Sequence, residues 1–121
     1  MAVMNQQEMK DRTKAFALRV TRLVQSLPRT REAEILGRQL FRSATSVGAN
    51  YRAVCRAKSR ADFISKLGTV EEEADESAYW LELLGDAGIV KRSLLSSLSK
   101  ECDEVTAIIV ATIRSAKRKR E

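Results

Sequence analysis

The chain has 121 residues, of which 44% are hydrophobic and 31% are charged, with one proline, five glycines and no histidine. A chain of this length forms a single domain with its own core, here residues 1–121, and this composition favours α-helices over strands or disorder. The two cysteines, Cys55 and Cys102, lack the spacing of a zinc site. Because the sequence shows no secretion signal, we expect a reducing compartment, which favours two small buried thiols over a disulfide. We expect no metal and no cofactor.

The charges are distributed unevenly along the chain. The net charge is +6, with thirteen basic and four acidic residues in 1–60, one and eight in 61–90, and eight and four in 91–121. This asymmetry indicates an anionic partner for the basic parts, an internal pairing of helices by charge, or both. No apolar run reaches the length of a membrane span, about 18 residues, and the first residues lack the apolar stretch of a secretion signal. We therefore expect a cytoplasmic protein that does not bind membranes.

The first half of the chain predicts two helices. Apolar residues at helical spacing indicate a helix over residues 6–26, which Pro28 ends. Thr30 is suited to cap a second helix over residues 31–56. The apolar stripe of this second helix consists of Leu36, Leu40, Val47, Tyr51 and Val54. Gly48 is costly inside a helix, which indicates a close approach of another backbone.

The second half of the chain predicts two more helices. Ser59 is suited to cap a helix over residues 60–87, which Gly88 helps to end. A fourth helix over residues 93–117 precedes a basic tail at 117–121. Its run VTAIIVATI is β-branched like a strand, but its length and flanks favour a helix. Four amphipathic helices joined by short links predict an all-α fold, an antiparallel up-down-up-down four-helix bundle.

Five arginines of the second helix share one face. At about 100° per residue they lie within about 80° of arc, directly opposite the apolar stripe. These residues are Arg31, Arg38, Arg42, Arg52 and Arg56. A solvated helix surface is the simpler interpretation, but such a surface usually alternates charges, and only Glu34 lies near this face.

Arginine binds phosphate through two parallel hydrogen bonds, so the arginine stripe favours contact with a nucleic-acid backbone. We expect Arg12, Arg19 and Arg22 of the first helix to extend the same positive field, together with the basic tail. The sequence contains no base-reading motif, and contact should be sensitive to salt.

An acidic pattern suggests an alternative function. Glu71, Glu72 and Asp75, followed by Glu101 and Glu104, loosely resemble the pattern E-E-x-x-[ED] … E-x-x-D of all-α nucleoside triphosphate pyrophosphatases, in which helix carboxylates hold Mg²⁺. The last acid is Glu rather than Asp, and no basic motif for the phosphates accompanies it. A Mg-dependent pyrophosphatase is therefore kept as an alternative.

Three large side chains fall outside the apolar stripe of the third helix. They are Tyr79, Trp80 and Leu83, which a lone bundle would expose. Such a cluster is typical of a subunit contact, and we expect it to form an oligomer interface. The competing interpretation is that the segment GIVKRSLL folds back over these side chains.

Residues 27–84 resemble the four-helix-bundle proteins encoded in intervening sequences of bacterial 23S ribosomal RNA genes. That family shows a Leu-Pro turn, the run R-x-A-x-S-[VI]-x-A-N, a serine- and basic-rich turn, and F-x-x-x-L before an acidic helix. The matching residues are Leu27-Pro28, Arg42, Ala44, Ser46, Val47, Ala49, Asn50, Ser59-Arg60, Phe63, Leu67 and Glu71 to Glu73. Gly48 departs from a frequent proline, and Tyr51-Arg52 from an Ile-Ala or Ile-Val pair.

The resemblance implies an antiparallel four-helix bundle that assembles into a ring-shaped homopentamer. A related branch, the accessory variability determinant of diversity-generating retroelements, is a basic pentamer that binds a reverse transcriptase and nucleic acid. We therefore predict a non-enzymatic oligomeric bundle that binds RNA or DNA through its basic face, with a reverse transcriptase as a further partner. A purely structural oligomeric scaffold is the other alternative.

Overall fold

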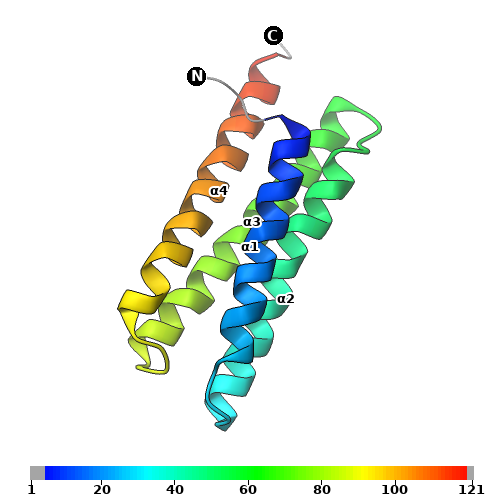
Figure 1. Cartoon of the computed structure of the whole chain (residues 1–121). Coiled ribbons are helices and arrows are strands. Elements are labelled where there is room, and N and C mark those ends of the chain that lie inside the picture. Colours follow the sequence, from blue (N-terminus) through cyan, green and yellow to red (C-terminus); the bar gives the residue numbers. More distant parts are fainter. Residues whose placement is uncertain (1–4, 120–121) are drawn as a thin grey trace.

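The computed structural model describes residues 5–119 and consists of four α-helices joined by short turns (Figure 1). The helices are α1 (Gln6–Gln25), α2 (Arg31–Val54), α3 (Arg60–Asp86) and α4 (Arg92–Arg118). The described residues contain no strand, and the β-branched run is helical, so the predicted all-α class is confirmed. Within these residues no helix is both long and apolar enough to cross a membrane.

Short polar side chains determine where three of the helices begin. Asn5 Oδ1 accepts a hydrogen bond from the backbone N–H of Glu8 at 2.8 Å, and the Glu8 carboxylate accepts one from the N–H of Asn5 at 3.2 Å. Thr30 and Ser59 cap α2 and α3 through their hydroxyl groups. After α3, Gly88 adopts a φ of 72°, a conformation that favours glycine and reverses the chain into α4.

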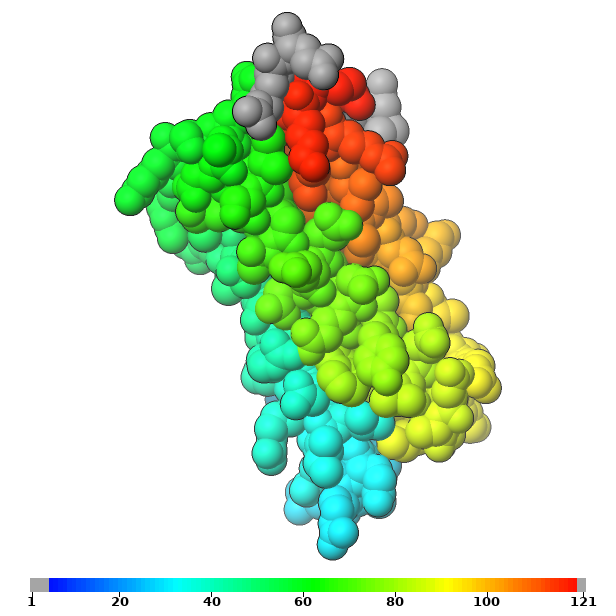
Figure 2. Space-filling model, turned by 180° about the vertical axis from the view of Figure 1, so that it is seen from behind, coloured from blue at the N-terminus to red at the C-terminus, as the bar shows by residue number. Residues whose placement is uncertain are grey.

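Neighbouring helices run in opposite directions. The packed pairs are α1 with α2, α2 with α3, α3 with α4 and, over a shorter stretch, α1 with α4. Thr13, early in α1, lies against Gly48, late in α2, and Leu27, just after α1, lies against Gly37, early in α2. The predicted close approach at Gly48 is therefore present. Seen from behind, α3 runs between α2 and α4 and covers the middle of the face (Figure 2).

Two clusters of buried side chains fill the bundle, one toward each end. The cluster at the end where α1 begins consists of Met9, Val47, Tyr51, Val54, Leu67, Val70, Ala74, Val105 and Ile109. The other consists of Phe16, Val20, Leu40, Ala44, Leu81, Leu84, Leu95, Leu98 and Cys102. Full burial of a large apolar side chain contributes about 1.5–3 kcal/mol, so these clusters supply most of the stabilisation.

The polar groups inside the bundle are hydrogen-bonded. The hydroxyls of Ser43 and Ser77 meet at 2.8 Å between α2 and α3, and no buried side-chain nitrogen or oxygen of the described residues lacks a partner. Cys55 and Cys102 are free thiols. Burial raises the pKa of Cys102 to about 12, so this thiol stays protonated and unreactive at neutral pH.

Removal of a core side chain should cost far more than removal of an exposed one of the same type. Leu40 is completely buried, whereas 70% of Leu94 is exposed. We predict that Leu40→Ala lowers the free energy of unfolding by about 2–5 kcal/mol. The control Leu94→Ala should change it by less than about 0.5 kcal/mol, as measured by urea unfolding followed by circular dichroism. Equal effects would contradict the assignment of α2 to the core.

Candidate nucleic-acid interface

Four of the five arginines of the predicted stripe point outward. The last of the five, Arg56, lies in the turn after α2, which ends at Val54 rather than at residue 56. Because α2 packs against α1 on one flank and α3 on the other, only one face of this helix remains open to solvent. Arg31, Arg38, Arg52 and Arg56 are exposed there, and none of them forms an ion pair with a described acidic side chain. The structure therefore leaves these four charges uncompensated by the described residues.

Arg42 differs from the other four. Its guanidinium group reaches α3, where Nη1 lies 3.4 Å from Glu73 Oε1 and Nη2 contacts the Glu76 carboxylate. Glu76 also accepts a hydrogen bond from Trp80 Nε1 at 3.0 Å. The expectation that only Glu34 lies near the arginine face does not hold at Arg42, because Glu73 and Glu76 of the neighbouring helix α3 reach it.

Arg12 and Arg19 face α4 rather than α2. Arg12 Nε lies 2.7 Å from Glu101 Oε2, and its Nη2 lies 2.9 Å from Glu101 Oε1 and 2.6 Å from Glu104 Oε1. Hydrogen bonding to Glu101, then to Glu104, raises the pKa of Arg12 above its usual value despite desolvation. Arg19 donates to the Ser97 hydroxyl at 2.9 Å.

The prediction that Arg12 and Arg19 extend the arginine stripe of α2 is therefore wrong. Their charges are directed to the interface between α1 and α4, where Arg12 is held by carboxylates. Arg22 is exposed on the same helix. In the predicted basic tail, Lys117 and Arg118 form the last turn of α4, while residues 120–121 lie outside the described residues.

A basic groove lies between α1 and α2. It is a cavity of about 530 Å³ lined by Gln7, Lys10, Asp11, Lys14, Ala17, Thr45, Gly48, Ala49 and Arg52. Lys10 and Lys14 of α1 line it together with Arg52 of α2, and neither lysine forms an ion pair with a described residue. Its one acidic residue, Asp11, accepts a hydrogen bond from Gln7 Nε2 at 3.0 Å. Three cations therefore converge on a groove with one carboxylate.

Sequence reasoning missed the two lysines of this groove. At about 100° per residue, Lys10 and Lys14 lie about 160° around the helix from Arg12, on the other flank of α1. The flank that carries Arg12 meets α4, so the flank that carries the lysines meets α2. Helical geometry alone could have separated the two sets, but only the packing shows which set lies beside the arginines.

A separate hollow of about 390 Å³ lies near the turn between α1 and α2. It is lined partly by Arg29, Glu34, Arg38 and Phe41. Arg38 and Arg52 are fourteen residues apart, or about 21 Å along the helix axis. We name Lys10, Lys14, Arg38, Arg52 and Arg56 the α1–α2 basic surface.

The carboxylates of the pyrophosphatase pattern do not come together. Glu101 and Glu104 bind Arg12 on the α1 side of α4, whereas Glu71, Glu72 and Asp75 belong to α3. Among residues 5–119 no group of three or more His, Cys, Asp or Glu side chains could hold a metal ion. The pattern therefore does not assemble the carboxylate site on which that alternative depends.

The predicted oligomer cluster is only partly exposed. Tyr79 is 55% exposed, while Trp80 and Leu83 are half-buried. The rings of Tyr79 and Trp80 pack edge to face with centroids 5.0 Å apart. Trp80 packs against the same core cluster as Ile89 and Val90 of the segment after α3.

Comparison with known proteins identifies the family. A family model described as 23S rRNA-intervening sequence protein matches residues 5–111. The chain belongs to this family. A crystal structure of a protein from Bacteroides thetaiotaomicron, described as a protein of unknown function from the S23 ribosomal protein family, superposes with a TM-score of 0.85 and 35% sequence identity. The match covers 92% of this chain and 99% of that one. A search of curated proteins found no significant match.

The ion pairs of this family member should differ in their contribution to stability. The Arg12 and Glu101 side chains are 24% and 20% exposed, whereas the Arg42 side chain is 48% exposed. We predict that Arg12→Met lowers the free energy of unfolding by about 1–3 kcal/mol, because it leaves the partly buried Glu101 carboxylate, and the exposed one of Glu104, without their donor. Arg42→Met, the matched control, should lower it by less than about 1 kcal/mol in the same urea titration. The reverse order would refute this ranking.

Proposed function

We propose that this protein is a non-enzymatic nucleic-acid-binding bundle that contacts the sugar-phosphate backbone of RNA or DNA through the α1–α2 basic surface. The observation that carries the proposal is the groove between α1 and α2, where Lys10, Lys14 and Arg52 converge. Thr45, Gly48 and Ala49 also line it. Small side chains at these positions leave room for a phosphate to approach the cations closely.

The dimensions of the surface fit a polyanion better than a single small anion. About 21 Å of helix separates Arg38 from Arg52, a length that corresponds to roughly six nucleotide steps of one strand at 3.4 Å each. Guanidinium groups bind phosphate through paired hydrogen bonds, and the lysines add point charges. Contacts of this kind fix a backbone in place without reading its sequence.

The net charge of the helices differs between the faces of the bundle. α3 carries eight acidic and two basic residues, whereas α1 and α2 together carry nine basic and four acidic residues. A nucleic acid would therefore be attracted to the face formed by α1 and α2 and repelled from the face centred on α3.

Removal of the groove cations should weaken binding selectively. The variant carrying Lys10→Gln, Lys14→Gln and Arg52→Gln should bind a short single-stranded RNA at least about tenfold more weakly than the unmodified protein, by fluorescence anisotropy at about 100 mM salt. Because three phosphate contacts are lost, the slope of log K against log salt should fall by about 2 to 3.

A variant of equal net charge provides the control. Lys91→Gln, Lys100→Gln and Arg114→Gln remove three exposed cations that lie outside the groove. This variant should retain affinity to within about threefold. If both variants lose the same affinity for RNA, binding depends on overall charge rather than on the groove. If the unmodified protein binds neither RNA nor DNA, a purely structural scaffold is favoured.

We also propose that the protein is a homo-oligomer, with the five subunits that the family resemblance implies, and that Tyr79 and Leu83 lie in the subunit contact. Ile35 of α2 is 53% exposed and shares the flank of that helix from which Arg42 reaches α3. An exposed aromatic next to exposed aliphatic side chains is a common core of such contacts.

Charge introduced at this contact should dissociate the oligomer. Tyr79→Arg should lower the mass measured by light scattering toward that of one subunit, because a buried unpaired charge is costly. Leu94→Arg, at a still more exposed leucine of α4, is the control and should leave the mass unchanged. If only the Leu94→Arg control has a reduced mass, the subunit contact involves α4 instead of Tyr79.

A reverse transcriptase is proposed as a protein partner from the resemblance to the accessory variability determinant. The proposed partnership rests on that resemblance. Co-purification of a reverse transcriptase encoded next to this chain, retained at a salt concentration that removes nucleic acid, would be the expected result.

A further inference from the structure

A second cavity lies at the end of the bundle where α1 begins and α4 ends. Its volume is about 540 Å³, within the range of small-molecule sites. The apolar part of its wall is formed by Met9, Tyr51, Phe63, Ile108 and Ile109. The cavity is distinct from the α1–α2 basic surface, since no residue is shared between them.

The sequence of α4 explains why this space is not filled. Thr112 and Ala116 continue the helical spacing of the buried Val105 and Ile109, at positions where the other layers of the core carry larger apolar side chains. Thr112 satisfies its own hydroxyl by donating to the Ile108 carbonyl at 2.8 Å. One turn along α1 from Met9, Arg12 forms its ion pairs with Glu101 and Glu104 and connects α1 to α4.

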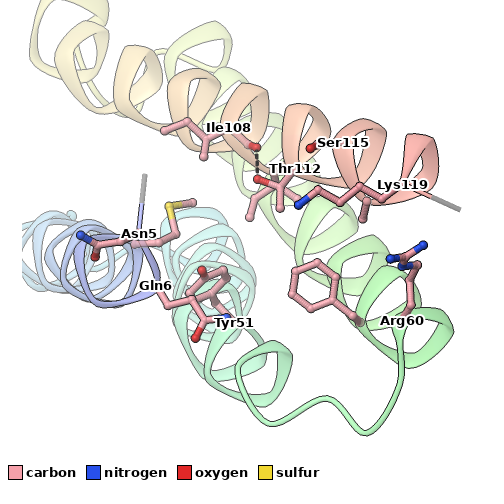
Figure 3. Close-up of a pocket in the computed structure, with 12 residues that line it drawn as sticks. Asn5, Gln6, Tyr51, Arg60, Ile108, Thr112, Ser115 and Lys119 are labelled. Atoms are coloured by element: carbon pink, nitrogen blue, oxygen red, sulfur yellow. Dashed lines mark hydrogen bonds between the residues drawn. The ribbon is translucent and has the colours of Figure 1, made fainter. Parts of the chain in front are cut away.

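The polar groups at the cavity are cationic or neutral. Arg60 and Lys119 lie on one side of the opening, and Asn5 and Gln6 lie on the other (Figure 3). None of the described residues that line the cavity is acidic. Tyr51 is 6% exposed, and burial, then the neighbouring Cys55, raises its pKa to about 12. Its hydroxyl therefore remains protonated at neutral pH, and a thiol is a weak partner for it.

We propose that this cavity binds a small anionic amphiphile, with its apolar body against Met9, Phe63 and Ile108 and its carboxylate or sulfonate between Arg60 and Lys119. An apolar wall with a few convergent polar groups is the usual construction of such a site. The cations select an acid over a neutral ligand of the same shape, because they pair with the anion at the mouth of the cavity.

The test uses decanoate and the uncharged analogue decanol, each below its aggregation concentration, in isothermal titration with the full chain. Decanoate should bind saturably with one molecule per chain. Its affinity should fall at least tenfold in the variant carrying Arg60→Gln and Lys119→Gln, whereas the affinity of decanol should be unchanged. The control Arg38→Gln with Lys100→Gln removes the same charge elsewhere and should leave decanoate binding intact.

A second variant tests the cavity independently of its charge. Ala116→Leu adds side-chain volume at the cavity wall and should abolish binding of both ligands while circular dichroism shows unchanged helicity. Absence of saturable decanoate binding to the unmodified protein would overturn the proposal, as would binding that survives Ala116→Leu. A change of oligomeric mass in this variant would overturn it too and would assign the cavity to a contact between copies. Binding to anionic vesicles without binding to free decanoate would equally contradict a single-molecule site.

Discussion

Burial of the apolar stripe of α2 between α1 and α3 is the constraint on which the rest of the molecule depends. Leu40, Ala44 and Val47 are completely buried, and this fixes the rotation of the helix about its axis. Once that rotation is fixed, the opposite face must be exposed, and with it Arg38, Arg52 and Arg56. The basic surface is thus a consequence of core packing. The interactions that fold the bundle also keep these cations exposed.

The positions of the acidic side chains decide which basic residues remain available to a partner. α3 supplies Glu73 and Glu76 to Arg42, and α4 supplies Glu101 and Glu104 to Arg12. Among the described residues, the groove lined by Lys10, Lys14 and Arg52 receives only the carboxylate of Asp11. Internal pairing by charge and an uncompensated basic face therefore coexist in one molecule, which is why the net charge alone says little about where an anion would bind.

Sequence periodicity was sufficient for the four helices, because long amphipathic runs with capping residues such as Thr30 and Ser59 leave few alternatives. It also placed the arginines of α2 correctly relative to the core. It could not assign Arg42 and Arg12 to their carboxylates, since those acids lie 31 to 92 positions away in the chain. The cavity at the end of the bundle could not be predicted from the sequence either. It arises because Thr112 and Ala116 of α4 occupy core positions that face the other helices.

The central claim is that nucleic acid contacts the lysines of α1 that face α2 rather than exposed lysines elsewhere. Lysine acetylation, measured by mass spectrometry with and without a saturating single-stranded RNA, tests this directly on the unmodified protein. RNA should protect Lys10 and Lys14 while Lys100 of α4 reacts at an unchanged rate. Protection of Lys100 with unchanged reactivity of Lys10 and Lys14 would contradict the central claim.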